Sequence, residues 1–323
     1  MKANVLLRYK FIGVLAIFVV LILLVGFFSP GYTFTTVQNI GNLLSFGPEL
    51  AIIVLGAGLL MIAGEFDLSV GSVLAFCAFV FQRLFTAGLH PLLSFIIVIA
   101  VGAVLGFING IITVKAKILS FITTLGTMML WRGLTLLLSG GIQSPCDTSA
   151  YPGFTALFSG TIGGFFPAQA VWYILIALLL VFLLHKHKFG NWVYSTGDNA
   201  MAARSMCINT DWVKIGCFMI VGALVALSSV IQIIRVAAFS SRVGTGWELR
   251  VIAAAVVGGT SLRGGRGTMI GIFLGACIIV IIENALTIMR LAYEWTFMVY
   301  GLVIMSAALL DLFIEKRKTK LAE

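Results

Sequence analysis

Polar side chains that stand inside long apolar stretches are the first candidates for chemistry in this sequence. They are Glu49, Asn109, Arg132, Glu283 and Asn284. Burying such groups in hydrocarbon is costly, so they either hydrogen-bond neighbouring helices or line the path of a polar solute. Both interpretations stay open for each residue. Their spacing does not form the ladder of carboxylates that a proton relay would need.

A glycine-rich stretch at 258–268 (GGTSLRGGRGT) has part of the spacing of a phosphate-binding loop. Gly259 and Gly264 are separated as in such a loop, but Gly265 stands where the phosphate-binding lysine is required. The sequence therefore predicts no ATPase site in this chain. The glycines instead predict a sharp turn with positive φ angles. The sequence also has no metal-spaced His/Asp cluster and no nucleophile beside a base, so we expect no metal site and no catalytic residue.

The composition indicates which solvent surrounds most of the chain. Of its 323 residues, 60% are hydrophobic and 10% are charged, whereas soluble domains carry roughly 25% charged residues. We therefore expect an all-α polytopic membrane protein. The net charge of +9 does not indicate nucleic-acid binding, because the Lys and Arg residues cluster between apolar runs, as loops facing an anionic membrane leaflet do.

Apolar windows predict about ten transmembrane helices in a single domain spanning residues 1–323. The eighth window is short enough to be a half-helix or a re-entrant segment. With the N-terminus inside, the outer side holds only five basic residues, and both termini are predicted to be cytoplasmic by the positive-inside rule. The predicted ranges are 11–28, 42–63, 70–88, 92–114, 118–139, 170–184, 212–234, 249–262, 268–286 and 295–313.

Two long loops separate these helices. The outer loop, about 140–169, is rich in Gly, Ser, Thr and Pro and is expected to form an irregular cap. The inner loop contains a short helical pattern at about 197–209. Gly197 is expected to end the preceding element, Asp198 or Asn199 to cap the helix, and Arg204 to favour its C-terminal end. With Ala202 and Ala203 on its face, this helix either docks into a partner or lies on the membrane surface.

Further polar residues lie at predicted helix ends. Asp67 and Ser69, before Gly71, either cap the third helix or shape a gate. Basic and acidic residues on the predicted outer face either dock an acidic soluble partner by charge complementarity or anchor the membrane interface. These docking candidates are Arg235, Arg242, Glu248 and Arg290.

Four stretches, in order along the chain, resemble motifs of the ribose/arabinose/rhamnose permease family of binding-protein-dependent ABC importers. The inner loop resembles the family's coupling helix, and the first stretch has Glu65 where the family usually has glycine. The stretches are 64–72 (GEFDLSVGS), 121–128 (FITTLGTM), 197–209 (GDNAMAARSMCIN) and 258–268 (GGTSLRGGRGT).

The resemblance implies a fold and a set of partners. The fold would be that of the cobalamin-importer-type (type II) ABC permease, in a bacterial inner membrane. Two permease chains, identical or related, would form the pathway. ATP and Mg²⁺ would be bound by separate ATP-binding subunits, and a soluble binding protein would deliver a simple sugar.

The resemblance also implies roles for the residues quoted above. Residues 197–199 and 202–204 would couple to the ATPase, while the gate or turn would use Asp67, Ser69, Gly71, Gly258, Gly259, Gly264 and Gly265. Apart from the resemblance, the cost of burying polar groups in hydrocarbon suggests candidates for the translocation path. They are Glu49, Asn109, Thr124, Arg132, Glu283 and Asn284. The alternative is an ion-coupled secondary sugar carrier that uses Glu49 and Glu283. No motif in the sequence supports a membrane-embedded enzyme or a receptor.

Overall fold

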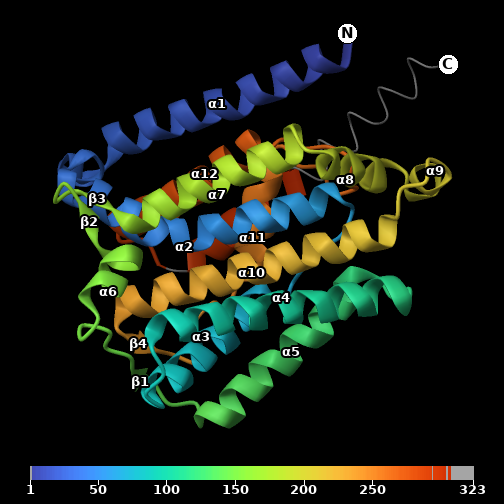
Figure 1. The fold of residues 1–323 in the computed structure, drawn as a ribbon. Helices are drawn as coiled ribbons and strands as arrows, with labels where there is room; N and C mark the ends of the chain where they lie inside the picture. Colours follow the sequence, from blue (N-terminus) through green and yellow to red (C-terminus); the bar gives the residue numbers. More distant parts are fainter. Residues whose placement is uncertain (1, 293, 303–304, 307–323) are drawn as a thin grey trace.

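The computed structural model describes residues 2–292, 294–302 and 305–306, with side chains from Ile12 onward. Long helices run side by side through this part of the chain (Figure 1). They are α1 (Lys2–Phe28), α2 (Val37–Ile62), α3 (Val70–Thr86), α4 (Pro91–Lys115), α5 (Ser120–Ser139), α7 (Ala168–His185), α10 (Thr210–Val236) and α12 (Met269–Ile288).

Shorter elements connect the long helices. The short helices are η1 (Pro30–Thr35), α6 (Pro152–Ser159), α8 (Lys188–Asp198), α9 (Ala200–Ser205) and α11 (Trp247–Val257). The strands form two antiparallel pairs, β1 (Ser144–Pro145) with β4 (Ala238–Phe239) and β2 (Thr161–Ile162) with β3 (Phe166–Pro167). The pair β1–β4 ties the segment after α5 to the segment after α10.

Among the described residues, 6 helices are long and apolar enough to cross a membrane, namely α2, α4, α5, α7, α10 and α12. Two shorter apolar helical segments are Ile12–Phe28 of α1 and Val70–Thr86. The chain is therefore a mostly helical, multi-pass membrane protein. Every predicted range up to residue 286 overlaps an observed helix. The last, 295–313, lies partly outside the described residues, which are helical at 294–302 and 305–306.

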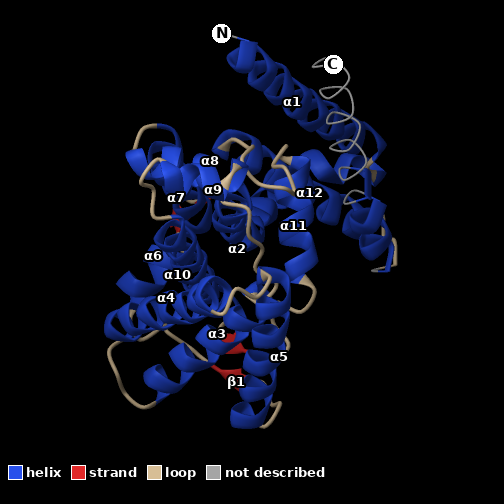
Figure 2. Cartoon of the chain, turned by 90° about the vertical axis from the view of Figure 1, so that its right-hand side faces the viewer, coloured by secondary structure: helices blue, strands red, loops and turns tan. Residues whose placement is uncertain are grey.

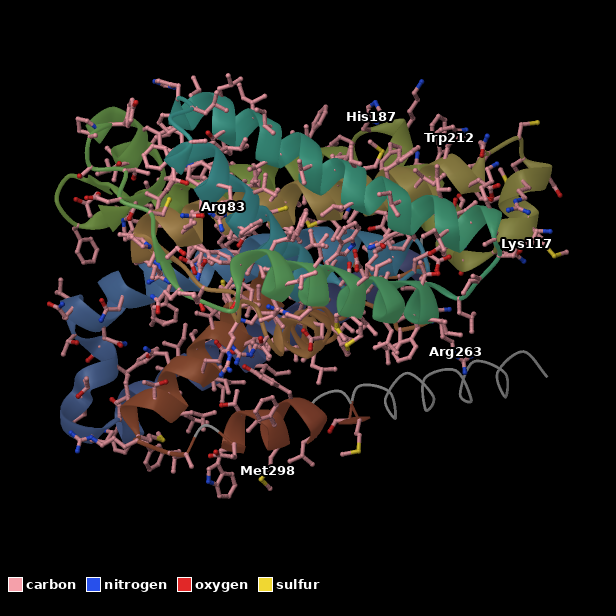
Figure 3. The ribbon with its side chains drawn as sticks, turned by 90° about the horizontal axis from the view of Figure 1, so that it is seen from below. Arg83, Lys117, His187, Trp212, Arg263 and Met298 are labelled. Carbon is pink, nitrogen blue, oxygen red and sulfur yellow. The ribbon has the colours of Figure 1, made fainter. Side chains whose placement is uncertain are left out.

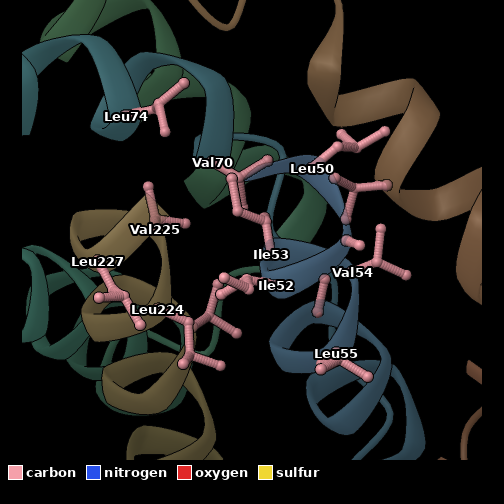
Figure 4. Close-up of a cluster of buried hydrophobic side chains, with 14 of the residues drawn as sticks. Leu50, Ile52, Ile53, Val54, Leu55, Val70, Leu74, Leu224, Val225 and Leu227 are labelled. Carbon is pink, nitrogen blue, oxygen red and sulfur yellow. The ribbon is translucent and has the colours of Figure 1, made fainter. Parts of the chain in front are cut away.

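Helix α2 forms the centre of the bundle. It packs against α10, α12, α7 and α11, and its residues from Gly47 to Ile62 are all buried. Figure 4 shows Ile52 and Ile53 of α2 facing Val70 of α3 and Leu224 of α10. By contrast, α1 lies outside the rest of the bundle, packed mainly on α12 (Figures 1 and 2).

The two ends of the bundle differ in character. At one end, here called the α9 end, α8 lies beside the ends of the long helices and α9 projects beyond them (Figure 1). Lys117, Trp212 and Arg263 lie at this end, and Arg83 lies toward the other (Figure 3). The opposite end carries η1, α6 and the β2–β3 hairpin, and we call it the hairpin end.

Two expectations about these segments were wrong in detail, and a third was decided between its alternatives. The short 249–262 window, for which a half-helix was one expectation, is the 11-residue α11. It is about 16 Å long at 1.5 Å per residue, which is half of a bilayer crossing. The loop at 140–169 is not wholly irregular, since it contains α6 and three strands. Gly197 does not end the element before the predicted coupling helix, because it lies inside α8.

Candidate functional site

Three of the four motif stretches meet at one point at the α9 end, which we call the glycine junction (Gly64, Gly197, Gly264 and Gly265). A Cβ atom added to Gly197 would lie 1.9 Å from the Ile62 carbonyl oxygen and 2.6 Å from the Gly265 nitrogen. One added to Gly264 would lie 2.7 Å from the Gly64 Cα. Glycine is required here because backbone packs directly on backbone.

The end of α2 explains why this contact forms. Glu65 N bonds Leu60 O (3.2 Å) and Gly64 N bonds Met61 O (3.0 Å), with Gly64 at φ +88°. This is the Schellman ending of a helix, which leaves the carbonyl of Ile62 without an intrahelical donor. Gly265 N supplies that donor at 2.8 Å. The turn after α11 therefore completes the hydrogen bonding of the end of α2.

The turn at 258–268 has the predicted conformation. Gly259, Gly264 and Gly265 have φ of +84°, +83° and +69°, a region in which side-chain-bearing residues are strained. Gly258, whose φ is −65°, is needed for another reason: a Cβ there would lie 2.5 Å from the carbonyl oxygen of Gly271 in α12.

The unit formed by α8 and α9 rests on this junction. Tyr194 of α8 donates its hydroxyl to the carbonyl of Gly267 at 2.8 Å. Burial raises the pKa of Tyr194 to about 12, so this hydroxyl is a neutral donor at neutral pH. A Cβ at Gly265 would lie 2.7 Å from the Cα of Asp198. The α8–α9 unit is thus held on the bundle through α8.

Helix α9 presents an apolar tip. Asn199, not Asp198, caps it by accepting a bond from Ala202 N at 3.0 Å. Ala203 is buried, whereas Met201 and Met206 are 79% and 73% exposed. Arg204 donates to Thr210 Oγ1 (2.7 Å) and Asp211 Oδ1 (2.6 Å), which fixes α9 against the start of α10. The helix covers six residues, fewer than the 197–209 expected.

The loop before α3 is held inside the bundle by side-chain bonds. Its backbone donates from Phe66 N to Ser120 Oγ (3.1 Å) and from Leu68 N to Thr124 Oγ1 (3.0 Å). Ser69 stands at the N-cap of α3 but makes no side-chain cap bond, contrary to the capping hypothesis. Its hydroxyl donates instead to Asp67 Oδ1 at 2.6 Å.

Asn109 of α4 completes this cluster. Its Nδ2 lies 2.9 Å from Ser69 Oγ and 3.5 Å from Asp67 Oδ2, while its buried Oδ1 has no partner. Three predicted residues are thus brought together: Asp67 and Ser69 from the loop before α3, and Asn109 from α4. Nearby on the loop, Glu65 forms an ion pair with Lys214 of α10 at 2.5 Å, which connects this loop to the helix that follows α9.

Arg132 joins two loops that meet within the bundle. It donates to the carbonyls of Ser241 and Val243, both at 2.9 Å, and to that of Gly71, also at 2.9 Å. A Cβ at Gly71 would lie 2.1 Å from Gly244 O, so the start of α3 touches the loop before α11. The Arg132 guanidinium is therefore engaged by backbone carbonyls inside the bundle.

The remaining intramembrane polar residues are paired between helices. Glu49 of α2 is buried and forms an ion pair with Arg235 at the end of α10. Glu283 of α12 bonds Arg250 of α11 at 3.1 Å and accepts from Tyr300. Asn284 and Asn39 exchange amide hydrogen bonds of 2.9 and 3.1 Å.

The predicted docking residues do not form one exposed patch. Arg242 and Arg290 are exposed. Arg235 instead turns to Glu49, and a carboxylate oxygen of Glu248 lies close enough to Gly71 that an added Cβ would be 3.1 Å from it. Two of the four candidates therefore face into the bundle.

Several contacts could not be found from sequence. Lys214 and Tyr194 lie outside the recognised motifs. The glycine junction joins positions that are far apart in the chain. Glu65 did carry a signal, as the departure from its motif, but the sequence did not indicate its partner.

Buried backbone loops and half-helices that meet within a bundle of spanning helices are typical of membrane transport proteins. The chain belongs to the family described as branched-chain amino acid transport system/permease component, whose model matches residues 39–308.

Two groups of relatives are similar over most of their length. The ribose import permease protein RbsC of Escherichia coli K12 is 34% identical over 298 residues, which cover 90% of each chain. The autoinducer 2 import system permease protein LsrC of Salmonella typhimurium LT2 is 32% identical over 284 residues, covering 86% of this chain and 79% of the relative. No solved structure matches the chain.

Proposed function

We propose that this chain is the membrane-spanning permease subunit of an ATP-driven, binding-protein-dependent importer of a monosaccharide or a close derivative. The observation that carries the proposal is the α8–α9 unit, which projects from one end of the bundle and rests on the glycine junction. A helix of six residues with an exposed methionine on either side of a buried alanine has little to bury by itself. A groove on a partner would cover it.

The partner at that end is an ATP-binding subunit. Its groove receives Met201, Met206 and the small face of α9. ATP and Mg²⁺ bind to that subunit, so the permease holds no cofactor. A push on α9 is transmitted through α8 to the glycine junction, and from there to the ends of α2 and α11. The Glu65–Lys214 ion pair provides a second connection, to the loop before α3.

The transported solute is inferred from the relatives. The two relatives are named for import of ribose and autoinducer 2, although the family description mentions branched-chain amino acids. Glu49 and Glu283 are each paired with an arginine, and the amides of Asn39 and Asn284 are paired with each other. Because these paired groups leave little net charge inside the bundle, the interior favours a neutral polar solute. It passes near Asn109, whose Oδ1 is unpartnered, and near Thr124.

The arrangement in the membrane follows from charge. Basic residues such as Lys117 and Arg263 at the α9 end (Figure 3) favour a cytoplasmic position for that end, with the N-terminus on the same side. The protein then lies in the bacterial inner membrane with about ten crossings and the type II permease fold. A second permease chain, identical or related, completes the pathway. The binding protein docks at the hairpin end, where Arg242 and Arg290 are its exposed contacts.

The alternative, an ion-coupled carrier, requires carboxylates free to bind the coupling ion. Glu49 and Glu283, the residues on which that alternative was built, are both engaged by arginines. The importer therefore explains more of the observed contacts than the ion-coupled carrier does.

The test is co-purification of this chain with its partners from native membranes, followed by ATPase measurement with sugar-loaded binding proteins. Replacing Ala203 by Trp or Arg204 by Glu is expected to abolish ATPase co-purification. Lys186→Glu is the matched control, because Lys186 is an exposed basic residue outside α8 and α9. A wild-type chain that purifies alone and transports sugar in liposomes without ATP would overturn the proposal.

A further inference from the structure

A polar cavity lies at the hairpin end, between the start of α2 and the loop that leads into α7. Its volume is about 340 Å³, within the range of about 300–1,000 Å³ that is typical of small-molecule sites. It is far from the α8–α9 unit, which projects from the opposite end (Figure 1).

The lining of the cavity has a distinct chemistry. Among the residues that the structure describes, none that lines the cavity is Asp, Glu, Lys, Arg or His, although the chain carries a net charge of +9. Carboxamides and hydroxyls provide donors and acceptors side by side, and the ring of Phe165 adds an apolar wall. The polar lining residues are Gln38, Asn42, Ser45, Ser159, Thr161 and Gln169.

Three of the polar lining residues form a continuous polar face on α2. Gln38, Asn42 and Ser45 follow one another at helical spacing, so they share one side of α2. Asn39, on a different side, is already used in its pair with Asn284. The polar side of α2 therefore faces the hairpin without being required for helix packing.

Gln169 gives a second and independent indication. It is 1% exposed and lines the cavity. Its Nε2 donates to Ser159 Oγ at 3.3 Å, but its Oε1 has no hydrogen-bond partner. Leaving a buried acceptor unpaired is costly, and a ligand hydroxyl is the kind of donor that this amide lacks.

We propose that this cavity binds a neutral polyhydroxyl group, either a free monosaccharide or the glycosyl headgroup of a lipid. Such a group offers several O–H donors and acceptors to the carboxamides and a C–H face to Phe165. A charged sugar is disfavoured, because no side chain of opposite charge lines the cavity to replace its lost hydration. The site does not depend on the ATPase partner or on the cargo of the importer.

The test uses the purified full chain in phosphatidylcholine nanodiscs, with no ATP-binding subunit. Saturation-transfer NMR measures binding of D-ribose and D-glucose, with D-gluconate as the charged comparison. We expect the neutral sugars to bind and gluconate to give no signal. Asn42→Leu and Gln38→Leu remove carboxamides that are exposed, and each is expected to raise Kd about tenfold or more through loss of hydrogen bonds.

Gln143→Leu is the matched control, because Gln143 is an exposed carboxamide outside the cavity. A second set of nanodiscs contains a monoglycosyl diacylglycerol. If the neutral sugars do not bind but this lipid co-purifies with wild type and not with Asn42→Leu, the site holds the lipid headgroup. The proposal is overturned if neither probe binds, or if binding is unchanged in both cavity variants. Failure of ATPase co-purification would refute the importer while leaving this result intact.

Discussion

Replacing Gly197 with alanine tests whether the glycine junction transmits force between α8 and the bundle. The added Cβ would lie 1.9 Å from Ile62 O, about 1.5 Å short of the 3.4 Å at which ordinary contact begins. The atom it meets belongs to backbone, so no side-chain rotation relieves the clash. The same Cβ would also lie 2.6 Å from Gly265 N, so it displaces the donor of the 2.8 Å bond to Ile62 O.

The magnitude follows from three opposing contributions. Overpacking costs about 1–3 kcal/mol, and leaving the buried Ile62 carbonyl without a donor costs about 1–3 kcal/mol. Alanine inside a helix returns about 1 kcal/mol relative to glycine. The net loss in free energy of unfolding is about 1–5 kcal/mol. For a chain of 323 residues this lowers Tm by about 1.5–7 °C.

The assay is thermal unfolding in detergent combined with amide hydrogen exchange. Exchange is expected to rise together in 188–205 and 258–267, although these segments are distant in sequence. Gly216→Ala is the matched control, since Gly216 also lies near α8 but its Cβ would only reach Phe189 at 3.6 Å; its Tm should not fall. If Gly197→Ala kept the wild-type Tm and exchange, the junction would not be a tight backbone contact.

Three further predictions concern the paired polar residues. Arg132→Lys keeps the charge but cannot reach all three carbonyls, so stability should fall by about 1–3 kcal/mol, measured as a loss in Tm. In a double-mutant cycle, Glu65→Gln and Lys214→Gln should couple by about 0.5–1 kcal/mol, and less at high salt, because the pair is part-buried. Asn39→Leu alone should destabilise by about 1–3 kcal/mol by leaving a buried Asn284 amide unpaired, whereas adding Asn284→Leu should restore part of the loss.

Each of these has a control or a contrary outcome. Arg83→Lys, at an exposed arginine, should leave Tm within about 1 °C of wild type, and an equal loss there would remove the case for Arg132. Strictly additive effects in the Glu65–Lys214 cycle would show that the two charges do not interact. Additive losses at the two asparagines would argue against the reciprocal amide pair.

The helices could be predicted from sequence because each needs only a local apolar window, and α2 and α10 are marked by such windows along most of their length. The boundaries failed where tertiary contacts decide them. Gly197 was expected to end the element before the coupling helix, yet α8 ends one residue later, at Asp198, and Gly197 allows close packing on Ile62. The helix predicted at 249–262 ends at Val257, because Gly258 and Gly259 close α11 with a Schellman turn.

The site was only partly predictable for the same reason. Motifs identified Asp67, Asn199 and the turn glycines, since each has a local conformational signature. The partners of Glu65 and Arg132 lie 149 and up to 111 residues away, and no local pattern encodes such a distance. The inward contacts of Arg235 and Glu248 could not be predicted, because a charge near a helix end either faces solvent or turns to a buried partner.

The hydrogen bond between Ile62 and Gly265 also sets an order of events during synthesis. The acceptor leaves the ribosome about 200 residues before the donor, so α2 must enter the membrane with its last carbonyl unpaired. Closing so long a loop waits for α11 and the turn behind it. Nascent chains stopped before 258 should carry an α8–α9 unit that is open to protease, and chains extended beyond α12 should protect it. Assembly with any cytoplasmic partner would then follow completion of the turn, which delays exposure of a finished docking surface until the bundle is closed.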